Sequence, residues 1–189
     1  RAELDWALSH GYDYLHLMDP VLAMNDSGRL ESLHTILAAA QQKKPFRISV
    51  EVYAENINRH NLHLFDCYQI FDVGLQTINP AANRAIRRAF DREAFEEGLA
   101  LLRTFAQNIN LYLIYGLPGD NYSEFMKGVC FADSLGASTV FLNKLCVLDG
   151  TPLRREAGKF SIQYHRQPPY EIISNATYSY ADVANSESC

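Results

Sequence analysis

Residues 109–120 read INLYLIYGLPGD and decide the fold class of this sequence. The stretch is an apolar, β-like run that closes on the turn Gly116-Leu117-Pro118-Gly119-Asp120. A helical pattern follows over residues 122–135, with Phe125, Val129 and Ala132 on one face. A strand, a glycine-containing turn and an amphipathic helix in this order form the repeating unit of α/β folds.

The same unit recurs on both sides of that stretch. Strand patterns cover residues 14–18, 46–53, 69–76 and 139–148. Helical patterns cover residues 29–42, 56–67 and 81–106. The last of these is interrupted near Asp91, which could cap a second helix. Right-handed crossovers between the strands predict a parallel sheet of five strands. A doubly wound open sheet and an arc of a β/α barrel both fit this pattern, and in both a ligand binds at the carboxyl ends of the strands.

Composition excludes several classes of protein. The 189 residues are 48% hydrophobic, which is enough to bury a sizeable core and argues against intrinsic disorder. No apolar run of about 18 residues exists, so we expect no membrane span. The formal charge of -5, without a basic stripe, argues against nucleic-acid binding. The four cysteines lie far apart, as neither a disulfide framework nor a zinc motif, and no secretory signal opens the chain, so we expect a reducing cytoplasm.

The predicted strand ends carry the least expected residues of the sequence. They include Asp19, Glu51, Gln76 and the turn Asp149-Gly150-Thr151. Glu51 lies between Val50 and Val52, where a carboxylate either faces solvent or lines a pocket that takes a cation. Gly74, two residues before Gln76, suggests the close approach of a ligand or of another backbone.

The helical segments offer weaker candidates. Arg87 and Arg88 could contact an anionic group, although most arginines on helices are solvated. His60, His63 and Cys67 follow an i, i+3, i+7 spacing, which allows a metal site or simply a polar helix surface. In the strands, His16 alternates with its apolar neighbours and could point into a pocket or into the core.

Taken in order, these segments resemble the radical S-adenosylmethionine (radical SAM) superfamily. The resemblance covers residues 12–155 and is closest to the branch that often carries an upstream cobalamin-binding domain, such as the anaerobic Mg-protoporphyrin IX monomethyl ester cyclase. Gln76 and the Ile-Tyr-Gly-Leu-Pro run also resemble the oxygen-independent coproporphyrinogen oxidases. The segments that carry the resemblance are Asp19-Pro20, Glu51, residues 73–77, 85–88, 95–98, 113–120 and 147–153.

The resemblance implies an α/β fold, a partial (β/α) TIM-type barrel. We expect residues 1–155 to form about strands two to six of a six-stranded barrel, and residues 156–189 to form a tail that packs on it or leads out of it. The superfamily holds a [4Fe–4S] cluster on a CxxxCxxC loop after its first strand. This sequence has no such motif, so we expect the cluster cysteines upstream of Arg1 and a fragment that is inactive alone.

The resemblance also assigns S-adenosylmethionine (SAM) contacts to single residues. Glu51 corresponds to an acid that binds the ammonium or the ribose, and Gln76 to a polar residue near the ribose. Arg88 corresponds to an arginine that binds the methionine carboxylate. The backbone around Ile114–Gly116 and residues 145–147 would bind the adenine. Tyr112 stands where the coproporphyrinogen oxidases carry an aspartate that contacts the ribose.

The implied activity is the reductive cleavage of SAM to methionine and a 5′-deoxyadenosyl radical. That radical would abstract hydrogen from a small-molecule substrate for oxidation, cyclisation or methylation, with flavodoxin or ferredoxin as electron donor and, in the cobalamin-linked branch, cobalamin as a further cofactor. One alternative is a degenerate barrel that serves as a binding scaffold. Another is a β/α-barrel lyase or aldolase, for which Lys144 is the lysine inside a core strand that could form a Schiff base.

Overall fold

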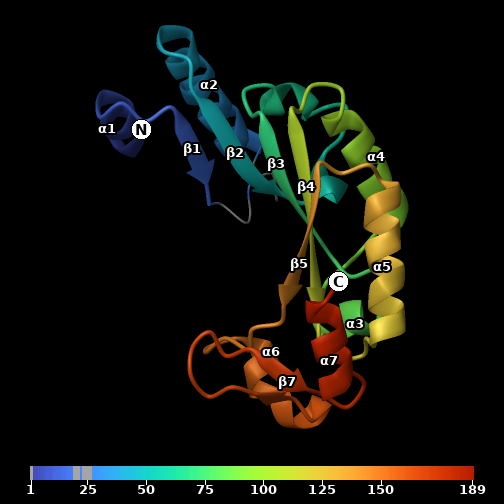
Figure 1. The fold of residues 1–189 in the computed structure, drawn as a ribbon. Helices are drawn as coiled ribbons and strands as arrows, with labels where there is room; N and C mark the ends of the chain where they lie inside the picture. Colours follow the sequence, from blue (N-terminus) through green and yellow to red (C-terminus); the bar gives the residue numbers. More distant parts are fainter. Residues whose placement is uncertain (1, 19–21, 23–26) are drawn as a thin grey trace. The chain divides into compact units, whose positions relative to one another are not determined.

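The computed structural model describes residues 2–18, 22 and 27–189, and within them five strands form one parallel sheet (Figure 1). The strands follow one another across the sheet in chain order, without the reversal that defines a doubly wound sheet. The sheet therefore has the strand order of an arc of a β/α barrel. Its strands are β1 (Tyr14–Leu17), β2 (Arg47–Val52), β3 (Ile70–Gln76), β4 (Asn108–Tyr115) and β5 (Thr139–Lys144).

As the sequence predicts, α-helices lie between β1 and β2, between β3 and β4, and between β4 and β5. Asp91 caps α4 by accepting a hydrogen bond from Ala94 N, which confirms the predicted break in residues 81–106. No described helix is long and apolar enough to cross a membrane. The α-helices are α1 (Ala2–Ser9), α2 (Ser27–Lys43), α3 (Pro80–Ala85), α4 (Arg92–Leu102), α5 (Tyr122–Ser134), α6 (Pro152–Arg155) and α7 (Tyr180–Glu187).

The helix predicted over residues 56–67 was wrong. The segment contains two short 3₁₀ turns, η1 (Ala54–Asn56) and η2 (Leu62–Phe65). Asn58 N donates to Asn61 Oδ1 at 2.9 Å, and Asn61 Nδ2 donates to Asn56 O at 2.8 Å. Because the Asn61 side chain takes backbone groups that a helix would need, it favours turns. The spacing of His60, His63 and Cys67 therefore does not place them on one helix face. Asp19 and Pro20 lie outside the described residues.

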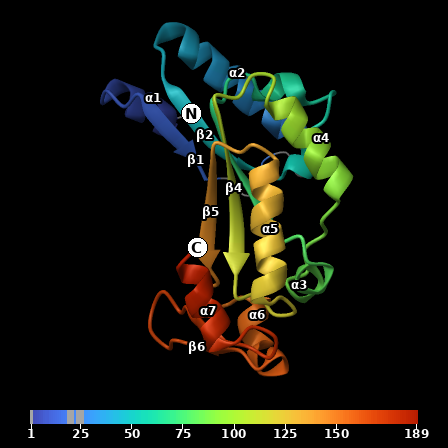
Figure 2. The ribbon, with the colours of Figure 1, turned by 45° about the vertical axis from the view of Figure 1, so that its right-hand side comes forward.

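The chain groups into two compact units, whose segments can be followed by residue colour in Figure 2. Unit 1 comprises Arg1–Gly74, Asp91–Leu111 and Ala137–Thr139, and unit 2 comprises Leu75–Phe90, Tyr112–Gly136 and Val140–Cys189. Each unit is built from segments that are separated in the sequence. The boundaries expected for a barrel over residues 1–155 and a tail over 156–189 stay predictions.

Strand alternation builds the core of unit 1. Ile48, Val50 and Val52 of β2 are buried, and so are Phe71 and Val73 of β3. Buried aromatic side chains, with ring centroids 6.1–6.4 Å apart, extend this core around the end of η2: Phe65, Tyr68 and Phe71.

Helix α4 packs against η1 through a glycine. A Cβ added to Gly98 would lie 1.9 Å from Ala54 O, so only glycine allows α4 to approach this closely. The contact joins two segments of unit 1 that are more than 40 residues apart in the sequence.

In unit 2, α5 packs on β4, and the C-terminal segment adds further structure. A Cβ added to Gly128 on α5 would lie 3.2 Å from Leu113 Cδ2, so the helix and the strand are in close contact. The C-terminal segment contains η3 (Ala157–Phe160), the antiparallel pair β6 (Gln163–Tyr164) and β7 (Ile172–Ser174), and α7. The buried Tyr178 hydroxyl hydrogen-bonds Ser186 Oγ at 2.6 Å and so ties α7 to the segment before it.

Candidate functional site

Gln76 ends β3 in a backbone conformation that side chains rarely adopt. Its φ is +63°, and Thr77 N donates across it to Leu75 O at 2.8 Å, which closes a three-residue turn. A non-glycine residue in the left-handed region costs of order 1–2 kcal/mol. Such strain concentrates at functional sites, where the surrounding structure maintains it. The half-buried Gln76 is therefore the strongest candidate in unit 2.

A buried carboxylate fixes the chain that follows Gln76. Asp120, which is 0% exposed, accepts hydrogen bonds from Thr77 Oγ1 at 3.1 Å and from Asn79 Nδ2 at 3.0 Å. It also accepts from Asn121 N at 3.0 Å. Burial raises the pKa of the Asp120 carboxyl above its usual value, although these hydrogen bonds act in the opposite direction. The loop after β3 and the loop after β4 are thus joined at one carboxylate, whose role the sequence analysis missed.

Asn83 connects the Gln76 turn to Arg88. Its side-chain Nδ2 donates to Thr77 O at 3.1 Å, and its backbone carbonyl accepts from Arg88 N at 2.9 Å. Arg87 is also left-handed, with φ +58°, and its guanidinium forms an ion pair with Glu156. The structure therefore brings the segments of Gln76 and Arg88 together and turns their neighbour Arg87 outward to solvent.

Two further predicted residues share the open face of β4. Tyr112 and Ile114 are half-buried and alternate with the buried Leu111, Leu113 and Tyr115. The ring of Tyr112 stacks on that of Phe141, with centroids 4.7 Å apart and planes 16° apart. The two rings form a stacked pair across β4 and β5, with the Tyr112 side chain half-buried and Phe141 exposed.

Gly116 is needed for packing as well as for the turn. Its φ is +85°, and an added Cβ would lie 2.7 Å from Ile172 Cγ2. Asn175 Nδ2 donates to Gly116 O at 2.9 Å, and Thr177 Oγ1 accepts from Gly119 N at 2.9 Å. The C-terminal segment therefore packs directly on the Gly-Leu-Pro-Gly turn.

The backbone assigned to adenine already makes protein hydrogen bonds. Leu145 N donates to Tyr115 O at 3.1 Å, and Val147 N donates to Tyr170 O at 2.9 Å. Leu145 O accepts from Ile172 N at 2.9 Å. A base bound here would have to use the remaining carbonyl lone pairs or other groups, because these two amides are taken.

In unit 1, Glu51 lies on the open face of β2. Its side chain is exposed, and it is the register partner of Asp72 on β3. Ser49 lies two residues earlier on the same face, yet it is 0% exposed. Glu51 can therefore contact a ligand, as well as water, from this face.

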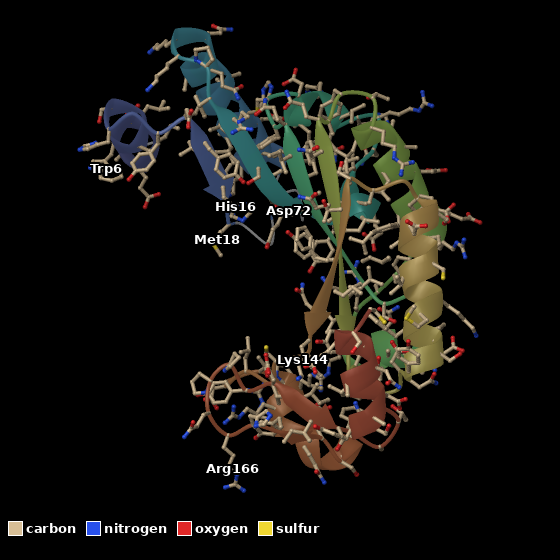
Figure 3. The ribbon with its side chains drawn as sticks, in the orientation of Figure 1. Trp6, His16, Met18, Asp72, Lys144 and Arg166 are labelled. Carbon is tan, nitrogen blue, oxygen red and sulfur yellow. The ribbon has the colours of Figure 1, made fainter. Side chains whose placement is uncertain are left out.

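The side chains that cover Ser49 form a network across neighbouring strands, and Figure 3 shows His16 and Asp72 within it. Ser49 Oγ lies 2.7 Å from Tyr14 Oη and 2.6 Å from His16 Nδ1. His16 Nδ1 lies 3.8 Å from Asp72 Oδ2, and Asn110 Nδ2 donates to Asp72 Oδ1 at 2.9 Å. The sequence analysis left His16 open and missed the other members, although polar residues at alternate strand positions are the signal that marks them.

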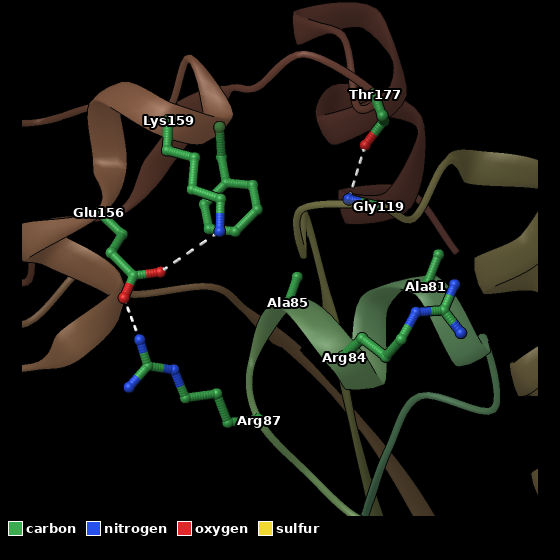
Figure 4. A pocket seen from close by; sticks show the side chains of 9 residues that line it. Ala81, Arg84, Ala85, Arg87, Gly119, Glu156, Lys159 and Thr177 are labelled. Atoms are coloured by element: carbon green, nitrogen blue, oxygen red, sulfur yellow. Dashed lines mark hydrogen bonds and ion pairs between the residues drawn. The ribbon is translucent and has the colours of Figure 1, made fainter.

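A pocket of about 450 Å³ lies beside α3 in unit 2 (Figure 4). Arg84, Arg87, Gly119 and Thr177 contribute to its wall, and Glu156 pairs there with Arg87 and, at 3.9 Å, with Lys159. Its cationic side chains are already balanced in part by this carboxylate. The strand ends, and not this pocket, therefore form the candidate site.

Lys144 does not fit a Schiff-base role. Its ammonium pairs with Glu187 and lies 3.6 Å from Glu171 Oε2. Burial alone would lower the pKa of Lys144, but the two carboxylates outweigh it and raise the pKa. A Schiff-base lysine needs a lowered pKa, so the lyase or aldolase alternative loses its candidate residue. Asp149, beyond β5, is exposed and pairs with Arg154 Nη2 at 2.9 Å.

Comparison with known proteins gives distant relatives. No family model matches the chain. It is 26% identical to the uncharacterized protein YtqA of Bacillus subtilis over 103 residues, which cover 54% of this chain and 32% of YtqA. It is 24% identical to the heme chaperone HemW of Buchnera aphidicola over 162 residues, which cover 71% of this chain and 43% of HemW. The chain thus spans less than half the length of both relatives.

Solved structures decide the fold. The radical SAM methyltransferase TsrM from Kitasatospora setae, with tryptophan and a SAM analogue bound, superposes with a TM-score of 0.71 at 15% identity, covering 89% of this chain and 35% of TsrM. Coproporphyrinogen III oxidase HemN from Escherichia coli, a radical SAM enzyme, superposes with a TM-score of 0.54 at 20% identity, covering 69% of this chain and 31% of HemN. The chain has the radical SAM fold.

The residues present fit one cofactor of radical SAM enzymes and not the other. SAM is a zwitterion with ribose hydroxyls, and the strand-end side chains include a carboxylate (Glu51), an amide (Gln76) and a guanidinium (Arg88), which match those groups chemically. The four cysteines, Cys67, Cys130, Cys146 and Cys189, lie far apart and do not form a CxxxCxxC motif. The cysteines of this chain therefore do not provide a [4Fe–4S] ligand set.

Proposed function

We propose that this chain forms the SAM-binding strand ends of a radical SAM enzyme. The observation that carries the proposal is the left-handed Gln76 at the carboxyl end of β3, where the family binds SAM. The whole protein would use SAM and a [4Fe–4S] cluster on a small-molecule substrate, with flavodoxin or ferredoxin as electron donor. The likeness to TsrM, whose structure was also determined with cobalamin bound, supports cobalamin as a further cofactor.

Each predicted residue would act on one part of SAM. The Arg88 guanidinium would bind the methionine carboxylate through two parallel hydrogen bonds. The Gln76 amide would hydrogen-bond the ribose, and the Glu51 carboxylate would bind the ammonium or a ribose hydroxyl. Held by these residues, SAM would be the source of a hydrogen-abstracting radical. The residues of this chain would orient SAM and exclude water.

Calorimetric titration of the purified chain with SAM tests the proposal directly. We expect binding that weakens at least about tenfold, or 1.4 kcal/mol, in Glu51→Gln, Gln76→Gly and Arg88→Met. Gln76→Gly removes the amide while keeping the left-handed backbone that glycine tolerates. Arg84→Met on α3 and Glu93→Gln on α4 are matched controls, because both side chains are exposed.

Two outcomes would overturn the proposal. Wild-type chain that is folded by circular dichroism but does not bind SAM would favour the binding-scaffold alternative. Unchanged affinity in all three variants would leave SAM binding in place but remove this site assignment.

A further inference from the structure

Apart from the residues proposed to bind SAM, unit 1 contains three neighbouring side chains with atoms that could bind a metal ion. His34, Asp66 and Cys67 each offer one nitrogen, oxygen or sulfur atom, and these three atoms lie within 4.8 Å of one another. His34 Nε2 is 2.8 Å from Asp66 Oδ1. The sequence spacing pointed to Cys67 with His60 and His63, but the fold places a different histidine beside it.

Local structure fixes the position of Cys67 against α2. Two side-chain amides donate to Cys67 O, Gln41 Nε2 and Gln69 Nε2, both at 2.9 Å. Gln41 lies on α2 seven residues after His34, which is two helical turns, so both side chains lie on the same face. The Gln69 side chain also accepts from Ile48 N at 2.8 Å. The helix that carries His34 and the turn that carries Asp66 and Cys67 are thus joined at the Cys67 carbonyl, and the Gln69 side chain links this turn to β2.

The chemistry of the three groups matches a borderline-soft divalent cation. Zinc binds imidazole nitrogen, carboxylate oxygen and thiolate sulfur at about 2.0–2.3 Å, so tetrahedral ligand atoms lie about 3.3–3.8 Å apart. Small side-chain rotations would bring the described atoms to that spacing. On binding, the Cys67 thiol would release its proton to solvent, and the resulting thiolate and the Asp66 carboxylate would balance the charge of Zn²⁺.

Exposure is graded across the cluster in a way that suits a bound ion. Cys67 is only 4% exposed, whereas the side chains of His34 and Asp66 are 22% and 64% exposed. An ion could reach the site from the solvent side and leave its fourth position to water. We propose that His34, Asp66 and Cys67 form a Zn²⁺ site that fastens α2 to the turn after η2.

The site is independent of SAM, and its test needs no substrate. The chain, free of any histidine tag and treated with chelator, is titrated with Co²⁺ as the probe and then with Zn²⁺. We expect one Co²⁺ per chain, a near-ultraviolet thiolate-to-cobalt charge-transfer band, and its loss when Zn²⁺ displaces Co²⁺. Cys67→Ser should abolish the band, and His34→Gln and Asp66→Asn should weaken metal affinity roughly 10–100-fold.

Matched variants separate this site from adventitious binding. His63→Gln lies close in sequence but outside the cluster, and Cys130→Ser removes an exposed thiol, so both should bind Co²⁺ as wild type does. If Cys67→Ser fails to fold, the partly exposed His34→Gln and Asp66→Asn carry the test. Absence of the band in wild type, or a band that disappears in Cys130→Ser and persists in Cys67→Ser, would overturn the proposal.

Discussion

The Thr77 hydroxyl donates to the buried carboxylate of Asp120 at 3.1 Å, and this bond joins the loops after two neighbouring strands. Asp120→Ala would leave three donors without an acceptor, on Thr77, Asn79 and Asn121. An unsatisfied buried donor costs about 1–3 kcal/mol, so we expect a loss of roughly 3 kcal/mol or more in unfolding free energy. Urea denaturation measures this loss in unfolding free energy. Asp120→Asn keeps one oxygen for two of the donors and should lose much less; equal losses would contradict this account.

The same carboxylate gives stability a dependence on pH. Because burial raises the pKa of Asp120 in the folded protein, the folded state keeps a proton that the unfolded state releases. Folding stability should therefore fall as pH rises from the ordinary carboxyl pKa of 3.8 through the raised value. Comparing urea midpoints of wild type and Asp120→Asn over this range isolates the contribution. An identical pH dependence in the two proteins would count against it.

The strain at Gln76 makes an unusual combination of effects testable. Glycine adopts a φ of +63° readily, so Gln76→Gly should be as stable as wild type or up to about 1 kcal/mol more stable, while it weakens SAM binding. Gln76→Val should lose about 1–2 kcal/mol, since a β-branched residue fits the left-handed region poorly. Thermal unfolding checks both. A destabilised Gln76→Gly would mean that the side chain, and not the ligand, explains the conformation.

A helix-favouring substitution should destabilise α4. Alanine usually stabilises a helix by about 1 kcal/mol relative to glycine. In Gly98→Ala, however, the new Cβ would lie 1.9 Å from Ala54 O, so we expect a net loss of about 2 kcal/mol or more in unfolding free energy. Gly158→Ala has no neighbouring atom within 4 Å of the new Cβ and should be close to neutral. Urea denaturation of the two variants measures the difference, and equal stability would contradict the close approach of α4 to η1.

The Cys67 thiol should resist modification in the metal-free chain. Burial, together with the Asp66 carboxylate, raises its pKa from 9.0 to about 12. Thiol reagents should therefore label the exposed Cys130 and Cys189 first, and Cys67 only on unfolding.

The folded state retains the Cys67 thiol proton as pH rises from 9 to 12, so the free energy of unfolding should fall over that window by at most about 1.4 kcal/mol per pH unit. Cys67→Ser should flatten this dependence. Rapid labelling of Cys67 in folded protein would contradict the burial.

The sequence predicts the sheet well because the strands alternate clearly. Ile48, Val50 and Val52 have the expected period, and their burial confirms it. The segment around Asn58 and Asn61 could not be predicted in the same way. Apolar spacing there fits a helix, but the Asn61 side chain competes for the backbone groups that a helix would use. Only the contacts of the folded chain show that turns form in place of the helix.

The candidate site was predictable in part. Glu51 and Gln76 stand out as polar residues at the ends of apolar strands. The role of Asp120 could not be read from its position in a turn, because it depends on donors some 40 residues earlier in the chain. The partners of Cys67 illustrate the same limit, since His34 comes from a helix that the spacing of nearby histidines does not reveal.

The contacts of residues 172–177 with the Gly116–Gly119 turn have a consequence for biosynthesis. Ile172, Asn175 and Thr177 complete that turn, and they follow it by more than 50 residues. On the ribosome, β4 and α5 can emerge before these partners do, so the turn lacks these contacts until residues 172–177 follow. Contacts of such sequence separation form late in folding. The Gly116–Gly119 turn should therefore gain these packing partners only after residues 172–177 have emerged.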